Sequence, residues 1–324
     1  GSVLMVGAVL SLYFSGATLH LPNTFDIPTL AKFSESVPFA ALISAIFLLA
    51  FCVKTPLFPF HGWLPVAYYE ASTTGTILLS AILSKAGVYG ILRISLGLFP
   101  NIMQEWNPWL LDLAIIGVLY GAIAAWAQTD FKRLIAYSSF SHINFVLAGL
   151  FVWDITAQSG AIIQALNHAI TITGLFLLAG WLAERLGSTS MEAAGGLAKY
   201  MPRLTWLTLF FVLSAVALPG LNNFVGEVLI LYGVVGQNVW LAAILGLTVI
   251  LSVVYMLRWM HSIYFEIPSP FQKNWVDIQP KETWLLVPLM VLIVWLGMYP
   301  MPALRQIEPA AEKIVSLAKM ENVK

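Results

Sequence analysis

Three ionisable side chains lie in apolar stretches of the chain, where a charge is costly. Lys85 stands near the middle of one stretch, Glu227 follows a Pro-Gly pair in another, and Lys54 ends a third. A charged group at the centre of a membrane-spanning helix costs about 2.5–3.5 kcal/mol on insertion scales. A buried amine or carboxyl group can gain or lose a proton when neighbouring charges change, because burial disfavours its charged form. These residues therefore predict proton movement through an apolar bundle.

Two histidines extend this pattern. His142 lies within AYSSFSHINF and His168 within IIQALNHAITITG, both deep in apolar segments and both among hydroxyl and amide side chains. Imidazole both accepts and donates protons near neutral pH. A lone histidine on a helix is more often a hydrogen-bonded core residue than a proton carrier. Two at similar depth favour a relay.

The segment after Lys54 has two interpretations. Pro56, Pro59 and Pro65 lack amide protons and are expected to break a helix. Irregular backbone in a membrane is tolerated where it is buried in protein or lines a polar cavity. Two interrupted segments, each with an ionisable residue, are typical of a transporter site. From the residues alone, Lys54 could equally be an interfacial lysine at an ordinary helix end.

The composition of the chain indicates the class of protein in which these residues lie. The chain has 324 residues, of which 59% are hydrophobic and 10% charged, with a net charge of zero and a mean hydropathy of +0.84. Soluble domains carry about 25% charged residues. The composition therefore excludes a soluble enzyme, a disordered chain and a nucleic-acid binder, and it predicts a polytopic membrane protein. A single cysteine excludes an internal disulfide.

Long apolar stretches predict an all-α fold with about nine transmembrane helices. The seventh stretch is too long for one straight helix and is expected to be interrupted at Pro219-Gly220 and at Gly226. The predicted spans cover residues 1–16, 38–54, 73–95, 108–127, 131–152, 159–184, 204–234, 239–264 and 283–300.

Basic residues in the short connections predict the orientation of the spans. One set of connections holds only Lys32 and Arg93. The other set holds eight basic residues and is expected in the cytoplasm; at its edge, Glu184 and Arg185 are expected to pair. This cytoplasmic set is Lys132, Arg133, Arg185, Lys199, Arg203, Arg258, Lys273 and Lys281.

The two ends of the chain differ in character. Residues 301–324 are too polar to span a membrane, and their apolar residues recur at roughly helical spacing, so they predict either a helix on the membrane surface or a frayed polar tail. The other end begins Gly1-Ser2, with no initiator methionine and no signal peptide, and runs at once into an apolar stretch. We interpret this beginning as an internal cut in a longer protein.

Five segments together resemble a known family. They are KTPLFPFHGWLPVAYYEASTTGTILLSAILSKAGVYGILR, DFKRLIAYSSFSHINFVLAG, GAIIQALNHA, GGLAKYMPRL and ALPGLNNFVGEVLIL, in this order. The chain is similar to the antiporter-like proton-pumping subunits of respiratory complex I over residues 1 to about 300. Glu227 favours the kind of subunit that carries an acid there, because the sister subunits usually carry a lysine.

The resemblance implies two inverted five-helix half-channels, each with a broken helix. It implies that Lys54 is the central lysine of the first broken helix and that Lys85 bridges the halves. His142 and His168 would connect them, and Glu227 would be the acid on the second broken helix, leading to the outer exit. The implied mechanism is a charge relay: a proton leaves Lys54 for Lys85 and passes over His142 and His168 to Glu227.

The resemblance also sets expected boundaries and departures. Residues 1–107 would be the rest of a first half-channel repeat, 108–264 a second repeat, and 265–324 a loop, the last transmembrane helix and an amphipathic tail. Val66, Tyr68 and Ser72 replace the usual Asp, His and Pro, a difference that concerns the loop and not the lysines. The family has several more spans upstream, including one with a glutamate that pairs with the first lysine.

A subunit of this kind would act as a translocase within an NADH:quinone oxidoreductase of the bacterial inner membrane. Its partners would be neighbouring antiporter-like membrane subunits and the lipid bilayer, and no nucleic acid. The redox chemistry would lie elsewhere, so no flavin, iron–sulfur cluster, quinone head-group site or metal is expected in this chain. Multisubunit sodium/proton antiporters and membrane-bound hydrogenases share part of the motifs and are the alternative; an assembly role without transport is a second alternative.

Overall fold

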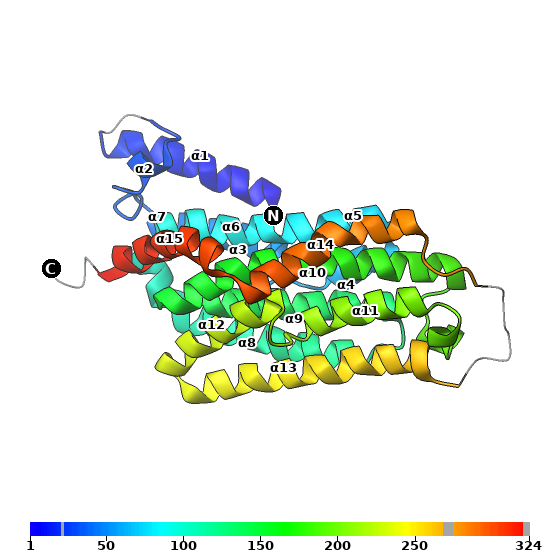
Figure 1. Cartoon of the computed structure of the whole chain (residues 1–324). Coiled ribbons are helices and arrows are strands. Elements are labelled where there is room, and N and C mark those ends of the chain that lie inside the picture. The colour runs from blue at the N-terminus through cyan, green and yellow to red at the C-terminus, as the bar shows by residue number, and fades with distance from the viewer. Residues whose placement is uncertain (21–22, 268–274, 320–324) are drawn as a thin grey trace.

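The computed structural model of the chain is a bundle of helices (Figure 1). It describes residues 1–20, 23–267 and 275–319. The α-helices are α1 (Ser2–Thr18), α2 (Ile27–Leu30), α3 (Ala40–Lys54), α4 (Trp63–Glu70), α5 (Thr73–Ile77), α6 (Ser84–Gly90), α7 (Leu96–Leu98), α8 (Pro100–Trp126), α9 (Phe131–Phe151), α10 (Ile155–Leu186), α11 (Pro202–Ala215), α12 (Asn222–Gln237), α13 (Val239–Met260), α14 (Pro280–Met298) and α15 (Met301–Lys319).

Within the described residues, six helical segments are long and apolar enough to cross a membrane, and three shorter apolar helices, α1, α3 and α11, accompany them. The prediction of an all-helical, multi-pass membrane fold is thereby confirmed. The six segments are Thr73–Leu98, Pro100–Trp126, Phe131–Phe151, Ile155–Leu186, Val239–Phe265 and Pro280–Met298.

Acidic caps set the starts of the two central helices. The Asp130 carboxylate accepts a hydrogen bond from the Arg133 amide at 2.9 Å, and the Asp154 carboxylate accepts one from the Ala157 amide at 2.9 Å. The first amides of a helix have no partner within the helix, and a carboxylate there also interacts favourably with the helix dipole. For this reason α10 begins four residues before the predicted span.

Helix α8 begins earlier than predicted because a distant residue caps it. The Glu35 carboxylate accepts hydrogen bonds from the amides of Asn101 at 2.8 Å and Ile102 at 3.3 Å. This cap satisfies the free amides of the first turn, so the helix starts at Pro100 and runs through Pro108, where the span was expected to begin. The capping residue Glu35 is distant from α8 in the sequence, so the sequence pattern of the helix itself does not reveal this start.

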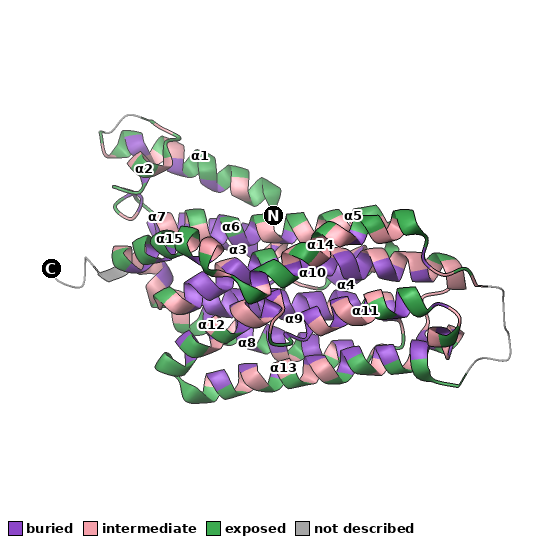
Figure 2. Cartoon of the chain, viewed as in Figure 1, coloured by how far each residue is buried: buried purple, intermediate pink, exposed green. Residues whose placement is uncertain are grey.

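Helix α9 lies at the centre of the bundle (Figure 2), where it packs against α8 and α10. Every residue from Ser138 to Val152 is buried. Polar side chains on such a helix face neighbouring helices and not lipid, so protein groups can satisfy them. His142 is one of these residues.

The first predicted break follows α3. Residues 55–62 are irregular, and α4 begins at Trp63. Pro56 and Pro59 lie in the break as predicted. Pro65 lies in the first turn of α4 and interrupts nothing, because an amide at that position would have no partner within the helix.

Helix α9 supplies hydrogen bonds to the freed backbone of this break. The Asn144 side-chain amide donates to the Pro56 carbonyl at 3.2 Å, and its oxygen accepts from the Phe58 amide at 3.4 Å. On the other side, the Trp63 indole donates to the Val53 carbonyl at 2.9 Å. Buried backbone groups need such partners in a membrane, so the break is held by side chains on both sides.

The second predicted break separates α11 from α12. Ala217 has φ of 56° and Gly220 has φ of 91°, both in the left-handed region. The Asn222 side chain donates to the Asn167 carbonyl at 3.0 Å and accepts from the Ser214 hydroxyl at 2.7 Å. The break is therefore tied to α10 and to the end of α11.

The interruption predicted at Gly226 is wrong, since α12 is continuous there. A Cβ atom at this position would lie 2.4 Å from Gln164 Oε1 and 2.9 Å from Gln164 Cα. Gly226 therefore serves the close approach of α12 to α10 and does not end a helix.

The segment that carries Lys85 is wound unevenly. Between α5 and α7 it contains two π-helical stretches, Leu78–Leu83 and Ile91–Ser95, on either side of α6. π-helical turns occur mostly as short insertions in α-helices and are frequent at functional sites. They flank the short α-helix in which Lys85 lies.

Arg185 forms its ion pair with a different partner from the one expected. Its guanidinium lies 2.7 Å from Glu282 at the start of α14, and it is not paired with the neighbouring Glu184. Consecutive helix residues point in different directions, which favours a partner from another helix. Lys273, part of the predicted cytoplasmic set, lies outside the described residues.

The tail forms a helix, α15, over Met301–Lys319. Leu304 and Ile314 are each 8% exposed, and α15 packs against α10. Of the two alternatives for the tail, a frayed segment is therefore wrong for residues 301–319, whereas residues 320–324 lie outside the described chain. Placement of this helix on the membrane surface stays a prediction.

Candidate proton-relay site

A buried acid, an imidazole and an amide meet where three helices join. Glu227 Oε1 on α12 lies 3.1 Å from His142 Nδ1 on α9 and accepts a hydrogen bond of 3.1 Å from the Gln164 amide on α10. Glu227 is 2% exposed and His142 8% exposed. A carboxylate in such surroundings needs a partner that offsets the loss of hydration. This cluster supplies a proton donor and a proton acceptor in direct contact.

His168 lies beside this cluster. Its ring is stacked on that of His142 with the centroids 5.4 Å apart, and its Nε2 lies 3.0 Å from the Ser139 hydroxyl. His168 is 3% exposed. Since a hydroxyl both donates and accepts, Ser139 gives this imidazole a partner in either tautomer.

Lys85 approaches the same cluster from α6. Its ammonium donates a 2.7 Å hydrogen bond to the Ser80 carbonyl, and it lies near enough to His168 for the two to interact electrostatically. An ammonium has three donors, and no carboxylate pairs with this one among the described residues. Its charge is therefore held only by neutral groups.

Lys54 lies apart from the other four residues, at the end of α3. The Lys54 ammonium makes no hydrogen bond or ion pair in the described part of the chain, and Lys54 lines a cavity of about 320 Å³ with Trp63 and Leu83. Its neighbour Thr55, however, donates a 3.0 Å hydrogen bond to the carbonyl of Ser84, the neighbour of Lys85. The two lysines are thus connected through a hydrogen bond between their chain neighbours, from the Thr55 hydroxyl to the Ser84 carbonyl, and not through their own side chains.

The structure adds a polar face that the sequence analysis missed. Thr248, Ser252 and Tyr255 on α13 are buried and line a small cavity of about 10 Å³ together with His142 and Glu227. The Tyr255 hydroxyl lies 3.0 Å from that of Ser138. The i, i+4, i+7 spacing of these three residues is the signal that could have revealed the face.

The contacts follow a different order from the chain. Lys85 interacts with His168, His168 stacks on His142, and His142 contacts Glu227. The resemblance places His142 before His168. Because α9 and α10 are adjacent helices joined by a short turn, packing between them and not position in sequence decides which imidazole faces the lysine.

The site consists of side chains whose types can bind and release protons. No group of three or more His, Cys, Asp and Glu side chains that could hold a metal ion occurs among the residues that the structure describes. Amine, imidazole and carboxyl groups in a line can pass protons by direct contact or through hydroxyl groups between them.

We expect Gly226→Ala to disturb this site through packing. The new Cβ would lie within 3 Å of Gln164 side-chain and backbone atoms, so α12 or α10 must shift. Overpacking of this kind costs about 1–3 kcal/mol, and it moves Gln164 away from Glu227. Thermal unfolding of the full-length subunit in its purified complex should show the loss.

Gly246→Ala is the matched control. A Cβ atom at Gly246 on α13 meets no described atom within 4 Å. Alanine favours a helix over glycine by about 1 kcal/mol, so this variant should be as stable as the unaltered protein or more stable. Equal stability of the two variants would contradict the packing argument.

Comparison with known sequences identifies a family. The family described as "NADH:quinone oxidoreductase/Mrp antiporter, TM" matches residues 1–253. NADH-quinone oxidoreductase subunit M of Pseudomonas aeruginosa is 39% identical over 302 residues, which are 93% of this chain and 59% of that protein. This chain therefore spans less than two thirds of its relative.

Solved structures show the same arrangement. A chain of respiratory complex I from Thermus thermophilus superposes with a TM-score of 0.88 at 34% identity, covering 98% of this chain and 66% of that one. A chain of the Mrp complex from Dietzia sp. superposes with a TM-score of 0.84 at 21% identity, covering 97% and 66%. The second likeness shows a shared fold alone.

Proposed function

Because the chain belongs to the NADH:quinone oxidoreductase/Mrp antiporter transmembrane family, we propose that it is part of a subunit that moves protons across the bacterial inner membrane. The driving reaction is electron transfer from NADH to a quinone, carried out by other subunits of the complex. The observation that carries this proposal is the buried contact between His142 and Glu227, with His168 stacked beside it.

The proposed path runs from the lysines to the acid. A charge change near Lys54 reaches Lys85 through the hydrogen bond from the Thr55 hydroxyl to the Ser84 carbonyl. Lys85 then releases its proton toward His168. Each transfer changes the charge next to the following group and so changes that group's affinity for a proton. Lys54, Lys85, His142, His168 and Glu227 are thus the proposed relay.

The last step of the path is the best supported by geometry. His142 Nε2 and Glu227 Oε2 have no hydrogen-bond partner among the described residues, and both residues line the cavity of about 10 Å³. A volume of about 10 Å³ is at the lower limit of what can hold one water molecule. A water there could carry a proton between the acid and the hydroxyl groups of α13.

The proposed partners follow from the relatives. Subunit M is by its name one part of NADH-quinone oxidoreductase, and the proposed neighbours of this chain are the other antiporter-like membrane subunits of such a complex. Within that assembly this chain is a translocase component without a redox centre of its own.

Replacing His168 with glutamine tests the relay. Glutamine can still hydrogen-bond to Ser139, but unlike imidazole it does not take up and release a proton near neutral pH. In proteoliposomes containing the intact complex, the ratio of protons moved to NADH oxidised should fall by the whole share of this subunit. His261→Gln, at an exposed position, should leave the ratio unchanged. An unchanged ratio in the His168 variant would refute the relay.

The alternative is a sodium/proton antiporter subunit, because the matching family includes Mrp antiporters. The two functions differ in their dependence on sodium and on electron transfer. Sodium-dependent proton exchange by vesicles that lack all redox partners would favour the antiporter. Proton uptake that requires NADH oxidation and persists without sodium would favour the oxidoreductase.

A further inference from the structure

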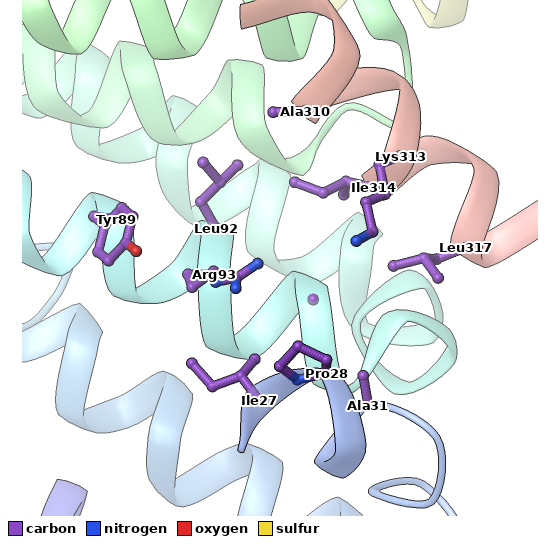
Figure 3. Close-up of a pocket in the computed structure, with 11 residues that line it drawn as sticks. Ile27, Pro28, Ala31, Tyr89, Leu92, Arg93, Ala310, Lys313, Ile314 and Leu317 are labelled. Carbon is purple, nitrogen blue, oxygen red and sulfur yellow. The ribbon is translucent and has the colours of Figure 1, made fainter. Parts of the chain in front are cut away.

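A cavity of about 390 Å³ lies between α2, the end of the Lys85 segment and α15 (Figure 3). Its walls come from three parts of the chain that are distant in sequence. The lining residues that matter most for its chemistry are Tyr89, Leu92, Arg93, Lys313, Ile314 and Leu317.

Two positive charges meet in this cavity. Arg93 and Lys313 are both exposed, and their basic ends point into the same gap in Figure 3. No hydrogen bond or ion pair of either side chain occurs in the described chain. The nearby Asp26 carboxylate is occupied locally, since it accepts hydrogen bonds from the Thr29 amide at 3.0 Å and the Thr29 hydroxyl at 2.5 Å.

The rest of the lining is apolar. Leu92, Ile314 and Leu317 form a surface beside the two cations, and the ring of Tyr89 extends it along the helix. Arg93 lies five residues before Leu98, the last residue of the spanning segment. A long basic side chain at that depth reaches the level of lipid headgroups while its stem stays on apolar surface.

The walls of the cavity are fixed in place. The Ser34 hydroxyl donates to the Leu98 carbonyl, and Glu35 caps α8, so the turn after α2 is fastened to the end of the spanning segment. On the opposite side, Ile314 belongs to the buried core. The cavity is therefore a built site and not a gap between loose segments.

We propose that this cavity binds an anionic phospholipid, with its phosphate between Arg93 and Lys313 and an acyl chain along Tyr89, Leu92 and Ile314. Two free cations above apolar surface match a molecule with a negative headgroup and a hydrocarbon tail. Basic pockets between transmembrane helices bind acidic headgroups in this way. The bound lipid would join α15 to the helix that carries Lys85.

Photo-crosslinking tests the proposal. The intact complex with the full-length subunit is placed in phosphatidylcholine nanodiscs containing a phosphatidylglycerol probe with a photoreactive acyl chain. Labelling should map to the peptides with Tyr89 to Leu92 and Ile314 to Leu317. Excess unlabelled phosphatidylglycerol should compete, whereas phosphatidylcholine and inorganic phosphate should not.

The double variant Arg93→Gln, Lys313→Gln should weaken binding roughly twenty- to thirtyfold, since each basic residue near a membrane surface contributes about fivefold. Lys313→Gln alone, at an exposed site, should give about fivefold and avoids any folding defect of the double variant. Arg305→Gln, on the same helix but outside the cavity, is the matched control. Undiminished labelling in both cavity variants, or competition by phosphatidylcholine or by inorganic phosphate, would overturn the proposal.

Discussion

Replacing Lys85 with methionine is expected to slow proton transfer through this subunit by at least about a hundredfold, the scale of a lost positioned proton carrier. Methionine fills the space of the lysine stem but carries no proton. The path would then have no proton carrier between Lys54 and His168. In the unaltered protein, Thr55 at the first break donates a hydrogen bond to Ser84, the neighbour of Lys85, and Lys85 interacts electrostatically with His168. The measurement is the ratio of protons moved to NADH oxidised in proteoliposomes of the full complex.

Lys85→Arg separates charge from proton carriage. Arginine keeps the positive charge and the donor to the Ser80 carbonyl but does not release its proton in proteins. Both variants should therefore lose transport if Lys85 carries the proton. Normal transport in the arginine variant would mean that only its charge matters.

Lys32→Met is the control for this pair. Lys32 is exposed and outside the proposed relay, so the same chemical change there should leave the ratio unaltered. Assembly is judged by the yield of intact complex. A normal ratio in Lys85→Met would exclude Lys85 from the path.

The sequence predicted the overall fold well because membrane spans are easily recognised from an amino-acid sequence. An apolar run of about 20 residues has few alternatives in a bilayer; prolines marked the first break, and the Pro219-Gly220 pair marked the second. The errors occurred where tertiary contacts determine where a helix begins or whether it is interrupted. Glu35, which is distant in sequence, caps the first turn of α8 and so moves its start. Gly226 permits a close approach of α12 to α10 where a break was expected.

The residues of the candidate site were also visible in the sequence, but their geometry was not. A charge in an apolar run stands out from its neighbours, as Lys85 and Glu227 do. Which side chain touches which depends on how α9, α10 and α12 pack. For this reason the contact of Gln164 with Glu227 and the order of the histidines came only from the structure.

Several expectations from the sequence stay predictions, the relay role of each site residue among them. The division of the chain at residues 107 and 264 into repeats stays a prediction, and so does the role of Lys54, whose ammonium has no partner in the described chain. Tyr68, which replaces a usual histidine, is fully buried and packs edge-on against Phe176 at 5.8 Å. The substitution therefore places an aromatic packing residue beside the break.

Replacing Glu227 with glutamine should abolish transport while leaving the fold intact. Glutamine has the shape of glutamate and can still accept from Gln164, but it cannot bind and release a proton and offers no charge to a protonated His142. The uncharged amide carries no charge to desolvate, and its oxygen can still face the Gln164 amide and His142 Nδ1, so no buried group loses its partner and the stability of the subunit should change by less than about 1 kcal/mol. Thermal unfolding and the proton-to-NADH ratio together measure the two effects.

Glu192→Gln, at an exposed position, is the matched control and should alter neither quantity. Glu227→Asp keeps the acid but shortens the reach to His142 by one methylene group, so it should retain part of the transport. If Glu227→Gln lost transport only because the subunit unfolds, its melting temperature would fall, and Glu227→Asp would transport protons no better than Glu227→Gln.

A double-mutant cycle decides whether the acid and the imidazole act as one unit. His142→Gln and the partly active Glu227→Asp should each slow transport, and the combined variant should be no slower than the slower single variant, because groups that act together lose their effect together. Losses that multiply would show two independent proton carriers. Such independence would contradict a relay that passes through the 3.1 Å contact between them.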